Sequence, residues 1–98
     1  MKNSKTKNKE QAKQSSVSFT EIAWEDYQYW QKEDPKLVER INDLIDECMS
    51  NPFKGTGKPE PLKGNLTGLW SRRIDREHRL LYVAEGGTIY IVGCRYHY

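Results

Sequence analysis

The sequence predicts an α+β fold in which two N-terminal helices pack on a twisted antiparallel β-sheet. In the first half of the chain, apolar residues recur at helical spacing. In the second half, short strand-like runs are separated by tight turns. We therefore expect the helices to cover one face of the sheet and leave the opposite face free to carry a site. The 98 residues are enough for one domain.

Residues 1–16 form a basic N-terminal extension, and residues 17–98 form the folded domain. The extension carries five lysines and one glutamate, and its apolar residues are Met1 and Ala12. It cannot bury enough apolar surface to offset the entropy lost on ordering, so we predict that it is disordered. Directly after it, Val17–Phe19 alternates in polarity and is expected to form an edge strand.

Two helices are expected next. Thr20 is suited to cap the first, whose aromatic side chains we interpret as packing residues and not as base-stacking platforms. Asp34 and Pro35 are suited to the N-cap and first position of the second, and Asn51–Pro52 should end it. In the first helix the recurring residues are Ala23, Trp24, Tyr27 and Trp30. The apolar stripe of the second helix is Leu37, Val38, Ile41, Leu44, Ile45 and Cys48.

A loop rich in proline and glycine is expected over Pro52–Pro61, followed by an antiparallel meander. Its strands should be joined by short turns at Asp75–Glu77 and Glu85–Gly87. The expected strands are Leu69–Ile74, His78–Ala84 and Thr88–Arg95.

Charge is distributed unevenly along the chain. Residues 17–52 carry three basic and nine acidic side chains, whereas residues 53–98 carry eight basic and four acidic ones. This asymmetry suggests an anionic partner for the second half, although solvation of a sheet face would explain it equally well. Cys48 and Cys94 are expected to be free thiols. Without an apolar run of about twenty residues or a secretory signal, we expect a cytoplasmic protein that does not enter the membrane.

Glu60 lies between Pro59 and Pro61, which restrict its backbone and hold its carboxylate on a stiff, extended segment. Such pre-organisation suits a general base, but a solvated glutamate in a rigid turn is the alternative. Arg73 and Arg79 flank the first turn of the meander and are expected to share a face. Basic residues suited to contacts with RNA phosphates are Lys58, Lys63, Arg72, Arg73, Arg76, Arg79 and Arg95.

The last four residues, Arg95–Tyr98, place His97 between two tyrosines. This ending suits base stacking and proton transfer, and the alternative is an ordinary tail. We interpret His78, which is flanked by charged residues in a strand, as structural. The spacing of Cys and His residues does not match a metal site, and phosphate-binding loops and nucleophile elbows are also missing. We interpret Gly55 and Gly57 as a sign of flexibility only.

Five stretches of the sequence closely resemble the YoeB (Txe/YoeB) toxins of the RelE superfamily. The resemblance extends from about Val17 to Tyr98, and the loop and the ending together are highly specific. The matching stretches are Trp24–Trp30, Pro52–Lys63, Gly68–Ile74, Glu77–Tyr82 and Cys94–Tyr98.

This resemblance implies a RelE-like fold similar to microbial ribonucleases, and cleavage of mRNA in the ribosomal A site. It implies that Glu60 is the general base, that Arg79 stabilises the phosphate and that His97 is the general acid. It further implies that Tyr98 positions the RNA. Lys63 and Arg73 match basic residues near the site. The implied partners are mRNA, the ribosome with its A-site rRNA, a YefM-type antitoxin and, through the antitoxin, operator DNA. Whether the protein forms a homodimer is left open by the sequence.

The expected reaction is a transesterification that needs neither metal nor other cofactor. The 2′-OH attacks the adjacent 3′-phosphate, and the products are a 2′,3′-cyclic phosphate and a 5′-OH. Two alternatives stay open: a non-catalytic module that binds RNA or the ribosome and blocks translation, and a toxin subunit that acts as a co-repressor with its antitoxin.

Overall fold

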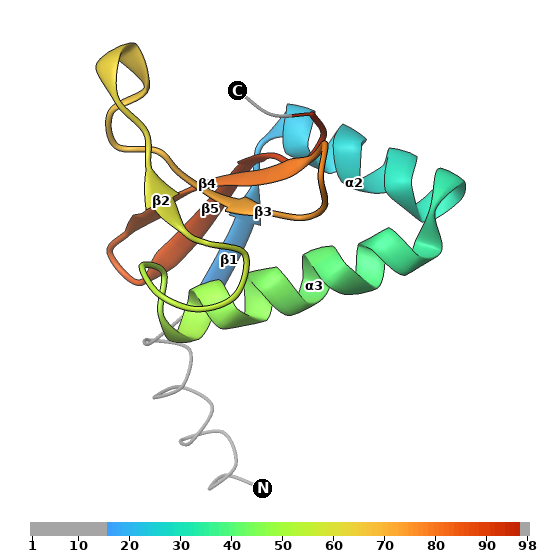
Figure 1. Ribbon diagram of the computed structural model, residues 1–98, viewed down its shortest axis with the longest axis horizontal. Helices are drawn as coiled ribbons and strands as arrows, with labels where there is room; N and C mark the ends of the chain where they lie inside the picture. The colour runs from blue at the N-terminus through green and yellow to red at the C-terminus, as the bar shows by residue number, and fades with distance from the viewer. Residues whose placement is uncertain (1–15, 97–98) are drawn as a thin grey trace, which may run out of the picture.

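The computed structural model describes residues 16–96; the predictions for residues 1–15 and for His97 and Tyr98 lie outside this range. Two helices and a five-stranded sheet make up the described chain (Figure 1). The elements are β1 (Ser16–Phe19), α2 (Glu21–Glu33), α3 (Pro35–Ser50), β2 (Glu60–Pro61), the 3₁₀ turn η1 (Gly64–Leu66), β3 (Trp70–Arg73), β4 (Arg79–Glu85) and β5 (Thr88–Gly93).

The sheet has the strand order β1-β5-β4-β3-β2. Strands β3, β4 and β5 pair antiparallel, which confirms the predicted meander. Strand β2, at the end of the segment predicted to be a loop, also pairs antiparallel with β3 and was not predicted. The edge strand predicted at Val17–Phe19 is also present, but it pairs parallel to β5, with Val17 opposite Ile89, so the sheet is mixed. Ser16, assigned from the sequence to the N-terminal extension, is the first residue of β1: its N–H donates to the carbonyl of Gly87 at 3.1 Å.

Both helices begin at the predicted caps. The Thr20 side chain accepts a hydrogen bond from the N–H of Ala23 at 3.1 Å, and Asp34 accepts one from Leu37 at 3.3 Å. Pro35 occupies the first position of α3, where the missing N–H has no intrahelical partner to lose. These caps satisfy N–H groups that would otherwise lack partners at each helix start.

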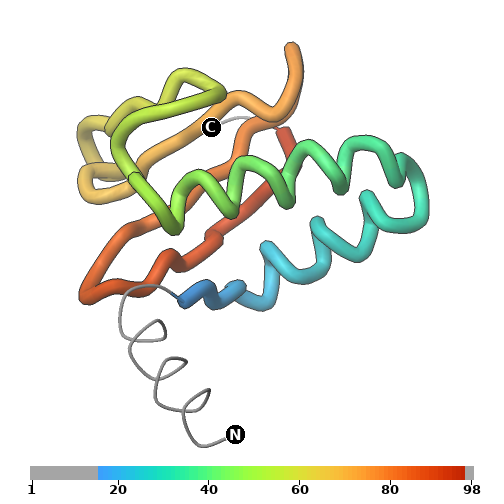
Figure 2. Tube along the Cα trace, turned by 90° about the horizontal axis from the view of Figure 1, so that it is seen from below, coloured from blue at the N-terminus to red at the C-terminus, as the bar shows by residue number. Residues whose placement is uncertain are grey.

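The hydrophobic core lies between the helices and one face of the sheet. Figure 2 shows α2 and α3 running side by side along the molecule. The buried part of the α3 stripe meets the inward residues of β4 and β5, which confirms the predicted covering of one sheet face. The α3 residues are Ile41, Leu44, Ile45 and Cys48; the strand residues are Leu80, Tyr82, Ile89 and Ile91.

The aromatic residues of α2 differ in burial. Trp30 is buried in the core as predicted, whereas Trp24 remains 45% exposed. Trp24 stacks on Tyr27, with ring centroids 5.6 Å apart, and meets the edge of the Phe19 ring at 5.5 Å. Trp24 therefore packs against neighbouring aromatic rings and stays partly open to solvent. Within residues 16–96, no helix is long and apolar enough to cross a membrane.

Candidate active site

Glu60 and Arg79 meet on the sheet face that the helices leave uncovered. Glu60 belongs to the two-residue strand β2 and lies opposite Ser71 of β3, while Arg79 begins β4. One Glu60 carboxylate oxygen, Oε1, is 3.5 Å from Arg79 Nη1. Both side chains are accessible to solvent, at 56% for Glu60 and 27% for Arg79. The sheet thus unites two residues that were predicted from the sequence to be catalytic.

The register between β3 and β4 decides which basic residues share this face. Arg73 lies directly opposite Arg79, which confirms that the two are on one side of the sheet. Ser71 is two residues before Arg73 and therefore points to the same face. The distance between its Oγ and Arg79 Nη1 is 3.4 Å. Leu81 faces the same way and is buried, so the Arg79 side chain lies beside an apolar part of the sheet.

Arg72 points to the opposite face, and its interpretation as a phosphate contact is wrong. Strand alternation turns it toward α3, where its side chain is fully buried. Its N–H groups bond the segment that precedes Glu60, so Arg72 organises the loop and is not available to RNA. The acceptors are the Asn51, Lys54 and Thr56 carbonyls, Glu47 Oε1 and the Tyr82 hydroxyl, at 2.7 to 3.3 Å.

Two of these Arg72 partners, the partly exposed Glu47 and the buried Tyr82, also bond the loop directly. Glu47 Oε1 accepts the N–H of Thr56 at 2.8 Å; this bond and the nearby Arg72 charge lower the pKa of Glu47. The Tyr82 hydroxyl donates to the Pro52 carbonyl at 2.6 Å. Burial raises the pKa of Tyr82 to about 12, so it remains a donor. The loop is therefore fixed from α3, β3 and β4 before it reaches Glu60.

Gly57 allows this loop to approach β3 closely. Its carbonyl accepts the N–H of Arg73 at 2.6 Å, and its φ is +87°. A Cβ atom at this position would lie 3.0 Å from the Arg73 carbonyl oxygen, closer than nine in ten real Cβ contacts. The interpretation of this glycine as a sign of flexibility alone is therefore wrong. The Pro-x-Pro sequence that follows was the available signal that the loop is ordered.

The remaining predicted RNA contacts are distributed over several segments, and Arg76 is exposed in the turn between β3 and β4. Lys58 and Lys63 are exposed on the loop and just after β2, and Arg73 is also exposed. The Arg95 guanidinium lies over the Tyr29 ring at 3.6 Å from its centroid, and Nη2 donates to the Tyr96 hydroxyl at 3.1 Å. Arg95 is thus held against aromatic rings on the α2 side of the molecule.

The chain passes the site again just before His97 and Tyr98. The carbonyl of Tyr96 accepts the backbone N–H of Arg79 at 2.9 Å. His78 is only 7% exposed, packs against Trp30 and accepts the Tyr96 N–H on Nδ1, so its ring is held inside the fold, in agreement with its structural interpretation. Arg79 therefore meets Glu60 through its side chain and the C-terminal segment through its main chain.

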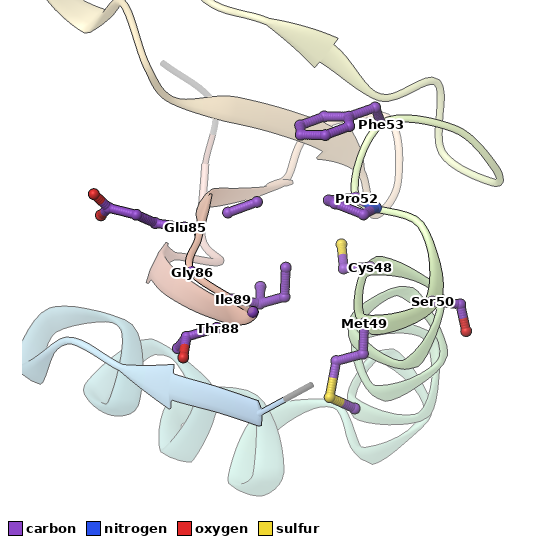
Figure 3. A pocket seen from close by; sticks show the side chains of 11 residues that line it. Cys48, Met49, Ser50, Pro52, Phe53, Glu85, Gly86, Thr88 and Ile89 are labelled. Carbon is purple, nitrogen blue, oxygen red and sulfur yellow. The ribbon is translucent and has the colours of Figure 1, made fainter. Parts of the chain in front are cut away.

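A cavity of about 340 Å³ lies elsewhere, between the end of α3 and the β4–β5 turn (Figure 3). Its lining is mostly apolar and includes Cys48 and Met49 of α3, Phe53, and Ile89 of β5. None of the described residues that line it is a predicted site residue. Both cysteines are free and buried. Burial raises the pKa of the Cys48 thiol, and raises that of Cys94 to about 12.

Comparison with known proteins gives matches over nearly all of the described domain. The model of the YoeB-like toxin of bacterial type II toxin–antitoxin systems matches residues 19–98. Toxin YoeB from Escherichia coli K12 is 52% identical over 80 residues, which is 82% of this chain and 95% of that protein. The YoeB dimer from Staphylococcus aureus superimposes with a TM-score of 0.81 at 46% identity, covering 87% of this chain and 99% of that one.

A second solved structure places a relative in a larger assembly. In the heterotetrameric YoeB–YefM toxin–antitoxin complex from Staphylococcus aureus, a chain 47% identical to this one superimposes with a TM-score of 0.80. The match covers 86% of this chain and 98% of that one. The family match, the identity and the fold agree along one continuous domain. This chain belongs to the family of YoeB-like toxins of bacterial type II toxin–antitoxin systems.

Proposed function

We propose that this toxin is an endoribonuclease that cleaves mRNA in the A site of the cytoplasmic ribosome by metal-independent transesterification. The observation that carries the proposal is the meeting of the Glu60 carboxylate and the Arg79 guanidinium at 3.5 Å on the uncovered sheet face. A carboxylate beside an arginine on an accessible surface pairs a proton acceptor with a group that binds phosphate oxygens.

Glu60 is the general base in this mechanism. It takes the proton of the 2′-OH as that oxygen attacks the adjacent phosphorus. The network around Arg72 supports this role because it fixes the loop before Glu60, and the pairing of Glu60 with Ser71 fixes its backbone. A base held in this way loses little orientational freedom when substrate binds.

Arg79 stabilises the charge that grows on the non-bridging phosphate oxygens. Its guanidinium meets Ser71 and Glu60 through Nη1. A bound phosphate would compete with Glu60 for this guanidinium, since a planar donor fork matches phosphate geometry. The exposed cations Lys58, Lys63 and Arg73 would add attraction for the RNA backbone.

His97 is the general acid, and Tyr98 positions the RNA. His97 donates a proton to the O5′ atom as the P–O5′ bond breaks, which leaves a 2′,3′-cyclic phosphate and a 5′-OH. Covalent connectivity supports the assignment, because Tyr96, the residue before His97, is bonded to the Arg79 N–H. Each acid–base step supplies about 10²- to 10⁴-fold, so the ribosome must contribute orientation by holding the codon.

We also propose that a YefM-type antitoxin neutralises this toxin and that the pair binds operator DNA through the antitoxin. The heterotetrameric complex of a Staphylococcus aureus relative with YefM supports this partner. The dimer formed by a relative from the same organism supports a homodimer.

End-group analysis of mRNA tests the catalytic proposal. Purified toxin is incubated with programmed ribosomes, and the 3′ ends of the fragments are examined for cyclic phosphate. We expect 2′,3′-cyclic phosphate and 5′-OH ends with the wild-type chain, and fragments that form about 10²- to 10⁴-fold more slowly with Glu60→Gln. Intact mRNA on stalled ribosomes would overturn the proposal and favour the non-catalytic translation blocker.

A further inference from the structure

Two consecutive residues, His78 and Arg79, hold the backbone of Tyr96: His78 through its side chain and Arg79 through its main chain. The Tyr96 N–H donates to Nδ1 of His78 at 2.6 Å, and the Tyr96 carbonyl accepts the N–H of Arg79 at 2.9 Å. Tyr96 has a φ of +66°, a region that residues with a side chain rarely adopt. Two hydrogen bonds on the polar groups of one residue explain how this conformation is maintained.

The His78 ring is itself held in place. It lies edge-on to Trp30, with centroids 4.6 Å apart, and 5.5 Å from the Tyr96 ring. Because Nδ1 accepts a hydrogen bond, it carries no proton, so the ring proton is on Nε2, 3.8 Å from Glu77 Oε1. The acceptor that faces Tyr96 is therefore fixed in both position and tautomer.

Cys94, two residues before Tyr96, is held by two side chains of α2. The indole N–H of Trp30 donates to the Cys94 carbonyl at 2.8 Å, and the Cys94 N–H donates to Asp26 Oδ2 at 3.1 Å. Trp30 thus contacts both His78 and the segment that His78 holds. The chain arrives at Tyr96 along a path defined by Asp26 and Trp30 of α2 and by His78, the residue before β4.

We propose that His78 is a positioning residue for the ribonuclease reaction: its Nδ1 acts through Tyr96 to set the origin from which His97 reaches the leaving oxygen. The proposal rests on the proposed function, in which His97 is the general acid. Arg79 ties the two halves of the site together, because its side chain meets Glu60 and its N–H meets Tyr96. Removing the His78 acceptor should displace the acid while the base and the phosphate-binding arginine stay in place.

A matched pair of substitutions isolates the acceptor. His78→Phe keeps a ring against Trp30 and Tyr96 but has no acceptor. His78→Asn keeps an oxygen close to the position of Nδ1 and loses the ring. We expect fast amide exchange at Tyr96 in His78→Phe and protected exchange in His78→Asn and the wild type. If thermal melts show that His78→Phe is unfolded, His78→Gln is used in its place. The Gln amide lies near the position of Nε2 and not near that of Nδ1, so this variant also lacks the acceptor for Tyr96.

Single-turnover cleavage on programmed ribosomes tests the effect on chemistry. We expect His78→Phe to lower the rate at saturating toxin by about 10- to 100-fold, with the concentration for half-maximal rate unchanged, and His78→Asn to stay within about threefold. Equal losses in the two variants would overturn the proposal. A higher concentration for half-maximal rate, with an unchanged rate at saturating toxin, would overturn it as well.

A substrate that needs no general acid separates positioning from a general structural defect. Replacing the scissile O5′ by sulfur provides a weakly basic leaving group that departs without protonation. On this substrate we expect His78→Phe and His97→Ala to approach the wild-type rate. A defect in His78→Phe that stays as large as with oxygen would overturn the proposal.

The wild-type chain distinguishes this inference from the function on which it rests. If the wild type cleaves neither substrate, the ribonuclease proposal fails, and Tyr96 amide exchange still measures the anchoring. If the wild type cleaves both and His78→Phe behaves as the wild type, the ribonuclease proposal stands and the role of His78 is refuted.

Discussion

Glu60 Oε1 and Arg79 Nη1 lie 3.5 Å apart although their strands, β2 and β4, are not neighbours in the sheet. The Arg79 side chain crosses β3 at Ser71, whose Oγ is 3.4 Å from the same nitrogen. A small hydroxyl at this position leaves room for the guanidinium and offers it an acceptor. The contact therefore depends on the register of three strands.

Removing the charge of Glu60 tests the base. We expect Glu60→Gln to lower the cleavage rate by about 10²- to 10⁴-fold, because the amide cannot take the 2′-OH proton. The free energy of unfolding should change by less than about 0.5 kcal/mol, since the side chain is exposed. Cleavage assays and urea denaturation measure the two quantities. The control is the exposed Glu85 at the far end of β4, whose change to Gln should leave both unaffected.

Two adjacent arginines should differ sharply in their contribution to stability. Arg72→Met leaves three loop carbonyls without their buried donor, and we expect a loss of about 3 kcal/mol or more in the free energy of unfolding. Arg73→Met, on the exposed face of the same strand, should change it by less than about 0.5 kcal/mol. Urea denaturation of both variants checks this, and similar values for the two would contradict the buried network.

Stability should depend on Glu47 in acid. Because its pKa is lowered in the folded state, chiefly by the bond from the Thr56 N–H, the folded protein binds this proton less readily than the unfolded chain. The contribution is therefore present at neutral pH and lost as pH falls through the folded-state pKa. We expect Glu47→Gln to be less stable than the wild type at pH 7 and the difference to shrink in acid. Urea midpoints measured from pH 7 to pH 3 would reveal it; a constant difference would argue against it.

Cys94 should be unreactive in the native protein. Burial raises its pKa to about 12, so little thiolate forms near pH 8, and the reagent cannot reach the sulfur directly. Cys48 is buried as well. We expect a thiol reagent to label both residues at rates limited by opening of the fold and to label them rapidly in denaturant. Rapid labelling of the native chain at either position would contradict this burial.

Deleting residues 1–15 should leave cleavage of mRNA unchanged. The proposed site residues all follow Asn51, and Ser16, which pairs with β5, is retained in this variant. Matched cleavage assays on programmed ribosomes check the prediction. A variant that also lacks Ser16 loses the bond to the Gly87 carbonyl and serves to show the effect of shortening β1.

Local signals in the sequence predicted most of the elements. The caps at Thr20 and Asp34, the apolar stripe of α3 and the two tight turns each depend on residues close together in the chain, so they could be interpreted without the fold. The proline pair around Glu60 likewise indicated an ordered segment. The family resemblance added the roles, and the comparisons confirm the family.

The sequence by itself determined the two helices, the edge strand and the three-stranded meander, because periodicity, capping and turn residues restrict the backbone locally. The proline pair pointed to Glu60, whereas the role of Arg79 came from the family resemblance, and the short strand β2 was not predicted. The tertiary structure alone decided that β1 runs parallel to β5, that Arg72 is buried while Arg73 is exposed, and that His78 holds Tyr96. These features depend on strand register and on contacts between distant segments. Neighbouring arginines in a strand have the same chemistry, and only the sheet determines which one meets the core and which one meets solvent.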